Sequence, residues 1–229
     1  MSADVRPKTR IPPLRHGQRL TRAEFMRRWE AMPELKHAER IEGKVDIMTP
    51  PISFDHSDPH SFVVWCLMTY RRATPGVRSL NETTTHVDGD NDFQPDAGLV
   101  IDPLHGGQTR YAGKYLEGAP ELVVEVAESS LRKDMGIKLE IYRRAGVLEY
   151  LVWHPSAKAI NCFRNRAGQF VPADLEGGVF KSNPFPGLWL NVPALVAEDL
   201  DAVWETLSAG LADPAHAKFK RKLARAKKG

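Results

Sequence analysis

The amino-acid sequence predicts an α/β (α+β) fold in which helices flank a mixed β-sheet. A compact apolar strand at 121–127 (ELVVEVA) is followed by a helical segment and then by a second strand at 147–154 (VLEYLVWH). A strand, a helix of roughly 15 residues and a strand in this order indicate a crossover between parallel neighbours in one sheet. Apolar residues make up 42% and charged residues 27% of the chain, an ordinary globular composition that excludes the disordered and fibrous classes.

The length of 229 residues suits one large domain with short appendages. We predict a domain over residues 17–211, preceded by a flexible basic arm at 1–16 and followed by a basic tail at 212–229. The longest apolar stretch, FVVWCLM at 62–68, is much shorter than the roughly 20 residues that cross a bilayer. Because the beginning of the chain also lacks the apolar core of a signal peptide, we expect a cytoplasmic protein without a membrane partner.

The first half of the chain alternates helices with hairpins. Four elements are expected in this order: a short helix from Thr21 to about Met32, a hairpin or bent strand over 39–48, a helix over about 59–73 and a hairpin over 77–101. Thr21 and Glu24 have the spacing of a capping box, and Gly43 separates two short alternating runs. The acidic turn DGDND joins the two β-prone runs of the last hairpin, and we interpret its aspartates as a solvated turn.

The second half contains the crossover and then further hairpins. The expected order is a glycine-rich loop over 102–119, the strand at 121–127, the crossover helix, the strand at 147–154, hairpins to about residue 190 and a helix at about 194–211. Ser129 or Ser130 is the predicted N-cap of the crossover helix, and Gly146 lies just past its end. The basic run from His216 to Lys228 is typical of a solvated terminus, and the same run could also meet phosphates.

The candidate catalytic and metal-binding residues lie on the central strands and on the crossover helix. Asp96 opens the apolar run at 97–101, and Glu125 lies inside an apolar strand where an uncompensated carboxylate would be heavily desolvated. Asp134, Lys138 and Tyr142 follow at i, i+4 and i+8 and so share one face of the helix. If that helix folds back over the end of the strand, Lys138 lies over Asp96 and Glu125.

Two converging carboxylates with oxygen ligands are suited to a hard cation, Mg²⁺ or Mn²⁺. A lysine beside such a metal would orient or deprotonate the attacking water and stabilise charge on a phosphoryl oxygen, which is the chemistry of phosphodiester cleavage. The competing interpretation is structural. Glu125 would then form an ion pair at the sheet edge, and Asp96 would merely cap a turn. From the residues alone both interpretations stay open.

Taken in order, several segments between residues 37 and 155 carry a family resemblance. They are ERIEGKV, the helix led by His60, QPDAGLVI, YLEGAPELVVEVAESS, and D-x-x-x-K-x-x-x-Y at 134–142 followed by RRAGVLEYLVW. This pattern resembles the Uma-two family of restriction endonucleases, a branch of the PD-(D/E)XK nuclease superfamily. The resemblance implies a restriction-endonuclease-like core in which Asp96 and Glu125 bind the divalent metal. The superfamily places its lysine two residues after the strand carboxylate, where this chain has Ala127, so Lys138 is the substitute that the resemblance implies.

Three further residues are implied as supporting groups. Glu39 matches a glutamate that the family carries before its first strand, and either completes the metal site through water or forms a surface salt bridge. His60 has three options, namely a hydrogen bond to a carboxylate, a phosphate contact and plain polarity at a helix start. Tyr142 completes the pattern on the helix.

The resemblance implies a Mg²⁺- or Mn²⁺-dependent endonuclease that hydrolyses DNA phosphodiester bonds. The alternative is a catalytically idle nuclease-fold module that binds nucleic acid or protein, and the modest net charge of +3 favours it. A hydrolase of another phosphorylated substrate would use the same two carboxylates. By analogy with nucleases that cut both strands, a homodimer is expected.

Overall fold

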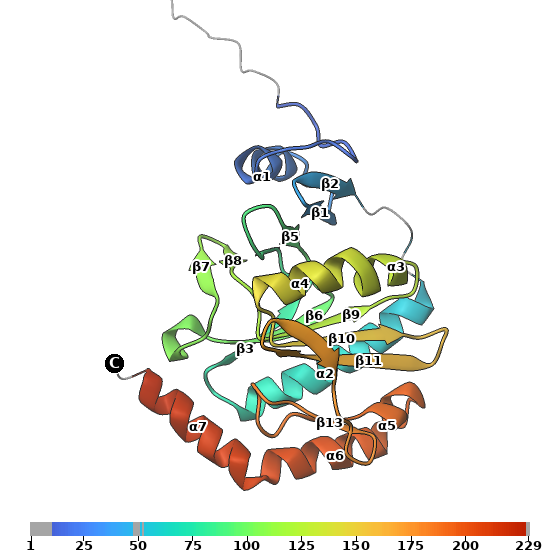
Figure 1. Ribbon diagram of the computed structural model, residues 1–229, viewed down its shortest axis with the longest axis vertical. Coiled ribbons are helices and arrows are strands. Elements are labelled where there is room, and N and C mark those ends of the chain that lie inside the picture. The colour runs from blue at the N-terminus through green and yellow to red at the C-terminus, as the bar shows by residue number, and fades with distance from the viewer. Residues whose placement is uncertain (1–10, 48–50, 52, 228–229) are drawn as a thin grey trace, which may run out of the picture.

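The core of this computed structural model is a mixed sheet of six strands in the order β12-β11-β10-β9-β6-β3 (Figure 1). The structure describes residues 11–47, 51 and 53–227. The strands of this large sheet are β3 (Val77–Asn81), β6 (Ala97–Ile101), β9 (Leu122–Val126), β10 (Glu149–His154), β11 (Ala159–Arg166) and β12 (Gln169–Pro172). Strands β9 and β10 are parallel neighbours, with Val124 opposite Leu151, and this confirms the predicted crossover.

The crossover contains a helix that is interrupted near its start. It consists of α3 (Leu131–Lys133), the π-helical turn η2 (Asp134–Lys138) and α4 (Leu139–Ala145). Gly136 leaves helical geometry at φ −114° and ψ −105°, whereas we expected one continuous helix. Gly146 ends α4 at φ +95°, as expected, but Ser130 makes no side-chain capping bond.

Alternation along β9 divides the core into two layers. Leu122, Val124 and Val126 pack into the cluster beneath α2 (Phe54–Ala73) and the C-terminal helices. Val123 packs on the opposite face, in the cluster covered by α4. Because Glu125 is two residues after Val123, its side chain points to the same face, beneath η2 and α4.

A smaller sheet with the strand order β2-β1-β5-β4-β8-β7 carries the N-terminal segment (Figure 1). Its strands are β1 (Ala38–Ile41), β2 (Lys44–Ile47), β4 (Thr85–His86), β5 (Asp92–Phe93), β7 (Arg110–Ala112) and β8 (Tyr115–Glu117). The predicted hairpins form, because β1 pairs with β2 while β3 pairs with β6 and β4 with β5. Against this sheet lies α1 (Arg22–Glu30), capped by Thr21 and anchored by buried Phe25 and Trp29.

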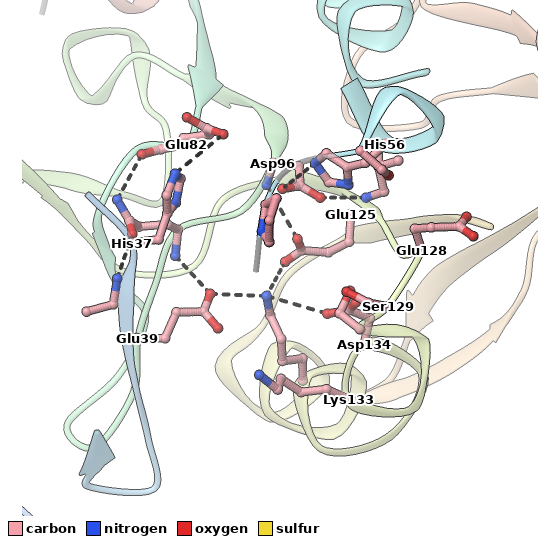
Figure 2. A pocket seen from close by; sticks show the side chains of 17 residues that line it. His37, Glu39, His56, Glu82, Asp96, Glu125, Glu128, Ser129, Lys133 and Asp134 are labelled. Atoms are coloured by element: carbon pink, nitrogen blue, oxygen red, sulfur yellow. Dashed lines mark hydrogen bonds and ion pairs between the residues drawn. The ribbon is translucent and has the colours of Figure 1, made fainter. Parts of the chain in front are cut away.

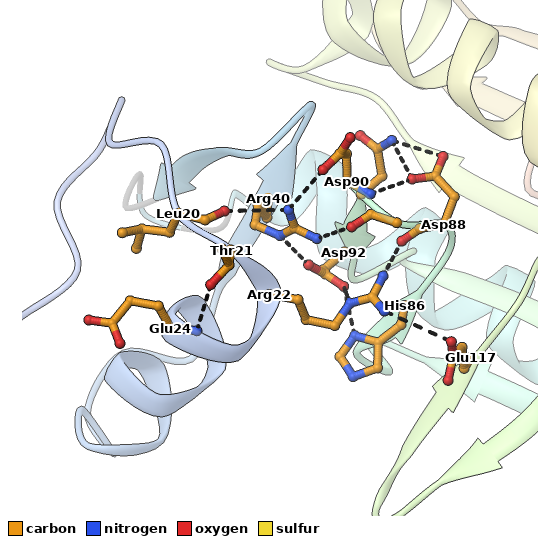
Figure 3. A network of polar contacts seen from close by, with 12 residues as sticks. Leu20, Thr21, Arg22, Glu24, Arg40, His86, Asp88, Asp90, Asp92 and Glu117 are labelled. Carbon is orange, nitrogen blue, oxygen red and sulfur yellow. Dashed lines mark hydrogen bonds and ion pairs between the residues drawn. The ribbon is translucent and has the colours of Figure 1, made fainter.

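The turn at 88–92 is not simply solvated, because Asp92 is buried (Figure 3). Its carboxylate accepts hydrogen bonds from Arg22 Nε (2.8 Å) and Arg40 Nε (2.5 Å). His86 Nδ1 lies 2.7 Å from the same group. A buried carboxylate needs such partners, so Asp92 ties α1 and β1 to β4 and corrects the sequence-based interpretation.

The helix expected at 59–73 begins earlier, since Ser57 N–H already donates to Ser53 O (3.0 Å). The expected helix at 194–211 is divided into α5 (Val192–Val196) and α6 (Leu200–Ala212), and both follow the hairpin of β13 (Val179–Lys181) and β14 (Trp189–Asn191). Within the described part of the chain no helix is long and apolar enough to cross a membrane.

Residues 212–227 of the predicted basic tail are not a solvated terminus. They form α7 (Pro214–Ala226), which buries Phe219 and Leu223 in the main core cluster. These apolar residues recur along one face between the basic residues, so the helix docks while its charges stay outside. At the other end, Leu14 of the predicted arm is buried beside Phe25, and residues 1–10 of that arm lie outside the described residues.

Candidate active site

An acidic pocket opens where β1 of the smaller sheet meets β9 and η2 (Figure 2), and it has a volume of about 280 Å³. Its central charged groups come from β1, from the residue before β6, from β9 and from η2. The central side chains are Glu39, Asp96, Glu125, Asp134 and Lys138.

Strand pairing brings Asp96 and Glu125 together. Ala97 of β6 lies opposite Val124 of β9 in the antiparallel register, so the next residues, Asp96 and Glu125, face each other at the end of the pairing. Asp96 N–H donates to Glu125 Oε2 at 3.4 Å, and Val126 N–H donates to Asp96 Oδ2 at 2.6 Å. The two carboxylates are therefore held at one point by backbone geometry.

The helical connection supplies the cation at the centre of the pocket. Lys138 Nζ lies 2.7 Å from Glu125 Oε1 and 3.1 Å from Glu39 Oε1. Asp134 Oδ1 is 3.5 Å from the same ammonium, and Tyr142 OH donates to Glu125 Oε1 at 3.0 Å. A π-helical turn is frequent at functional sites, and here it carries both Asp134 and Lys138.

Several carboxylates surround the Lys138 ammonium, and their burial and mutual repulsion shift the pKa values of the cluster. Burial raises the pKa of Glu125 well above its usual range, and the charges of Asp96 and Asp134 raise it further against the opposing effect of Lys138. Burial likewise raises the pKa of Asp96. Although burial alone would lower the pKa of Lys138, the charges of Glu125 and Glu39 raise it well above its ordinary value, so the amine keeps its proton.

These shifts predict a pH-dependent stability for the metal-free protein. The pKa of Glu125 is higher in the folded state than its ordinary value of 4.5. The folded state therefore binds the proton of Glu125 more tightly than the unfolded state, and this stabilises the fold fully below pH 4.5. This stabilisation is lost as the pH rises through the raised pKa. In urea titrations, the free energy of unfolding of the wild type relative to Glu125→Gln should therefore fall as the pH rises from 4.5 to 8. A difference that stays flat or rises would contradict the assignment.

One feature of the pocket fits a further ligand. Glu39 Oε2 is buried and has no hydrogen-bond partner among the described residues. In that part of the chain no group of three or more His, Cys, Asp or Glu residues is arranged so that it could hold a metal ion by itself. Mg²⁺ needs few protein ligands, because it keeps several waters and binds through one or two carboxylates. The pair Asp96 and Glu125, with the unsatisfied Glu39 oxygen nearby, therefore fits Mg²⁺ or Mn²⁺.

Comparison with known proteins identifies the family. A family model described as "Uma2: Putative restriction endonuclease" matches residues 22–193. The chain belongs to the Uma2 family. A search of the curated proteins finds no match for this Uma2 chain. Among solved structures, it is similar to one from Anabaena variabilis ATCC 29413, described as a "putative nuclease belonging to DUF820", with a TM-score of 0.56 and 17% identity over 84% of this chain and 99% of that one. At this identity the likeness supports the fold.

Four of the six residues singled out in the sequence line the pocket of this Uma2 protein, namely Glu39, Asp96, Glu125 and Lys138. The fifth, Tyr142, is buried behind them and bonds to Glu125. The interpretation of Glu39 as a surface salt bridge is wrong, because its side chain is buried against Lys138. Glu125 does form an ion pair with a basic residue, but in the buried centre and not at the edge of the sheet.

The sixth residue, His60, approaches the site indirectly. Its Nε2 lies 2.8 Å from the backbone oxygen of Asp96 and forms no ion pair with a carboxylate of the described residues. Sequence reasoning placed His56 in a loop and gave it no role at the site, but its Nε2 lies 3.8 Å from Asp96 Oδ1. The helix expected over about 59–73 began after this residue, although the i, i+4 spacing of His56 and His60 would have revealed a shared helix face.

Proposed function

We propose that this Uma2 protein is a Mg²⁺- or Mn²⁺-dependent endonuclease that hydrolyses DNA phosphodiester bonds. The observation that carries the proposal is the convergence of Asp96, Glu125 and Lys138, with 2.7 Å between the Glu125 and Lys138 charges. Asp96 and Glu125 would hold the ion, and Glu39 would contact it through water. When bound, the ion would supply an activated water and charge stabilisation at the phosphoryl group.

The residues of this chain divide the remaining tasks. Because its pKa is raised, Lys138 serves as a fixed positive charge that stabilises a phosphoryl oxygen, and not as a base. Tyr142 orients Glu125 through its 3.0 Å hydrogen bond. His56, near Asp96 and on the wall of the pocket, is placed to meet a phosphate.

The second candidate is the idle module that binds nucleic acid or protein. One observation favours it, since Lys138 and Tyr142 already occupy Glu125 Oε1. The homodimer expected by analogy stays a prediction.

Metal titration separates the two candidates. Addition of Mg²⁺ to EDTA-treated protein should raise its melting temperature, because an ion at 100 times its Kd stabilises the fold by about 2.7 kcal/mol. The same additions should start cleavage of supercoiled plasmid. If millimolar Mg²⁺ or Mn²⁺ neither stabilises the protein nor supports cleavage of any nucleic acid, the idle module replaces the endonuclease.

A further inference from the structure

The end of α2 that lies farther from the acidic pocket is close to α7 (Figure 1). A second hollow lies between these two helices. It is formed by the last turn of α2, β3, η1 (Pro103–His105) and α7, and has a volume of about 870 Å³. We call it the basic groove after its lining side chains Arg71, Arg72, Arg78, Lys220, Arg221 and Lys227. Asp102 is the one carboxylate among the described lining residues, and it pairs with Arg78 at 2.8 Å.

The walls of the basic groove are held in place by specific contacts. His105 Nδ1 lies 2.8 Å from Leu223 O, which joins η1 to α7. Gly76 has φ +97°, and a Cβ atom there would lie 3.0 Å from the His105 ring, so this close approach requires glycine. Phe219 and Leu223 anchor α7 in the core. The positive charges are therefore presented by a packed framework.

Helix dipoles explain the positions of only some of these basic residues. Arg71 and Arg72 lie in the last turn of α2, where cations are favourable. Lys220 and Arg221, however, lie in the middle of α7, and Arg78 lies in β3. Across residues 11–47, 51 and 53–227, no ion pair is formed by four of these cations, Arg72, Lys220, Arg221 and Lys227. Like charges gathered from separate elements repel one another unless an anion lies between them.

We propose that the basic groove binds the phosphodiester backbone of nucleic acid as a second contact, separate from the acidic pocket. A series of phosphates matches basic side chains spread over three elements, and such contacts position a nucleic acid without reading its sequence. Sixteen residue steps separate His56 from Arg72, a span of about 24 Å along the axis of α2. The groove would thus hold nucleic acid that flanks the segment in the pocket. The choice of ligand rests on the proposed nuclease function.

Two charge-matched triple variants test the groove in the full-length protein. Arg72→Gln, Arg221→Gln and Lys227→Gln remove exposed cations that line it. The control, Lys218→Gln, Lys222→Gln and Arg225→Gln, removes three exposed cations of α7 that lie outside it. Glutamine preserves helix propensity in both variants. Binding of a fluorescent DNA duplex is measured by anisotropy in EDTA between 50 and 200 mM NaCl, so that cleavage plays no part.

The groove variant should bind at least about tenfold more weakly than the wild type at 100 mM NaCl, and its log K against log [NaCl] slope should become shallower by about 2 to 3, since each lost phosphate contact accounts for about 0.9. The control variant should stay close to the wild type. Equal affinities of the two variants, or no duplex binding by the wild type, would overturn the inference. Preference for phosphatidylserine vesicles over the duplex would also overturn it. If metal-dependent cleavage fails while groove-dependent binding persists, only the nuclease proposal is contradicted.

Discussion

Replacement of Glu125 by glutamine, or of Asp96 by asparagine, is expected to reduce metal-dependent cleavage by at least about 10²–10³-fold. Each change removes one of two anionic groups proposed to hold the ion while keeping the size of the side chain. In Glu125→Gln the amide oxygen can still accept from Lys138 and Tyr142, so the local hydrogen bonds persist. The measurement is the initial rate of plasmid nicking at saturating Mg²⁺, with thermal denaturation to verify folding.

Glu128→Gln is the matched control for this experiment. Glu128 lines the same pocket three residues further along the chain, but it is bonded to Ser156 at the rim. Its replacement should leave the cleavage rate within about twofold of the wild type, since surface changes of this kind have small effects. Cleavage by Glu125→Gln at the wild-type rate would remove Glu125 from the proposed site.

The second large effect is on stability and concerns Lys138. Its replacement by methionine should lower the free energy of unfolding by about 3–5 kcal/mol at neutral pH, because it leaves buried carboxylates without their cation. The carboxylates of Glu125, Glu39 and Asp134 all lie within 3.5 Å of its ammonium. Urea denaturation in EDTA measures the loss.

A double variant identifies the cause of that loss. Adding Glu125→Gln to Lys138→Met removes one of the buried carboxylates that have lost their cation, and it should restore part of the stability. The control is Lys114→Met, which breaks the exposed pair with Glu30 and should cost less than about 1 kcal/mol. If Lys138→Met costs no more than this control, the buried ion-pair cluster does not support the fold.

Local sequence rules accounted for the framework of the site. The continuous apolar run of β9 indicated that Glu125 is surrounded by apolar neighbours, and helical spacing placed Lys138 and Tyr142 on one face. Gly146 marked the end of the crossover helix, because a helix commonly ends with a residue in the left-handed conformation and glycine is favoured there. These signals depend on neighbouring residues only, so they can be interpreted without the fold.

Other features depended on contacts between distant segments. Asp92 looked like part of a solvated turn, yet Arg22 and Arg40 come from about 50 to 70 residues away to compensate its burial. The Gly136 distortion in η2 was likewise hidden, because glycine in a helical pattern is compatible with several backbone geometries.

By itself, the sequence determined the crossover of β9 and β10, the carboxylates of the central strands and the helix face that carries Lys138, because periodicity and end signals are local properties of the chain. Only the tertiary structure decided that Glu39 joins the same buried cluster, that His56 reaches Asp96 and that α7 docks to complete the basic groove. Those outcomes depend on strand register and on the balance of burial and charge between segments far apart in sequence, which no local pattern contains.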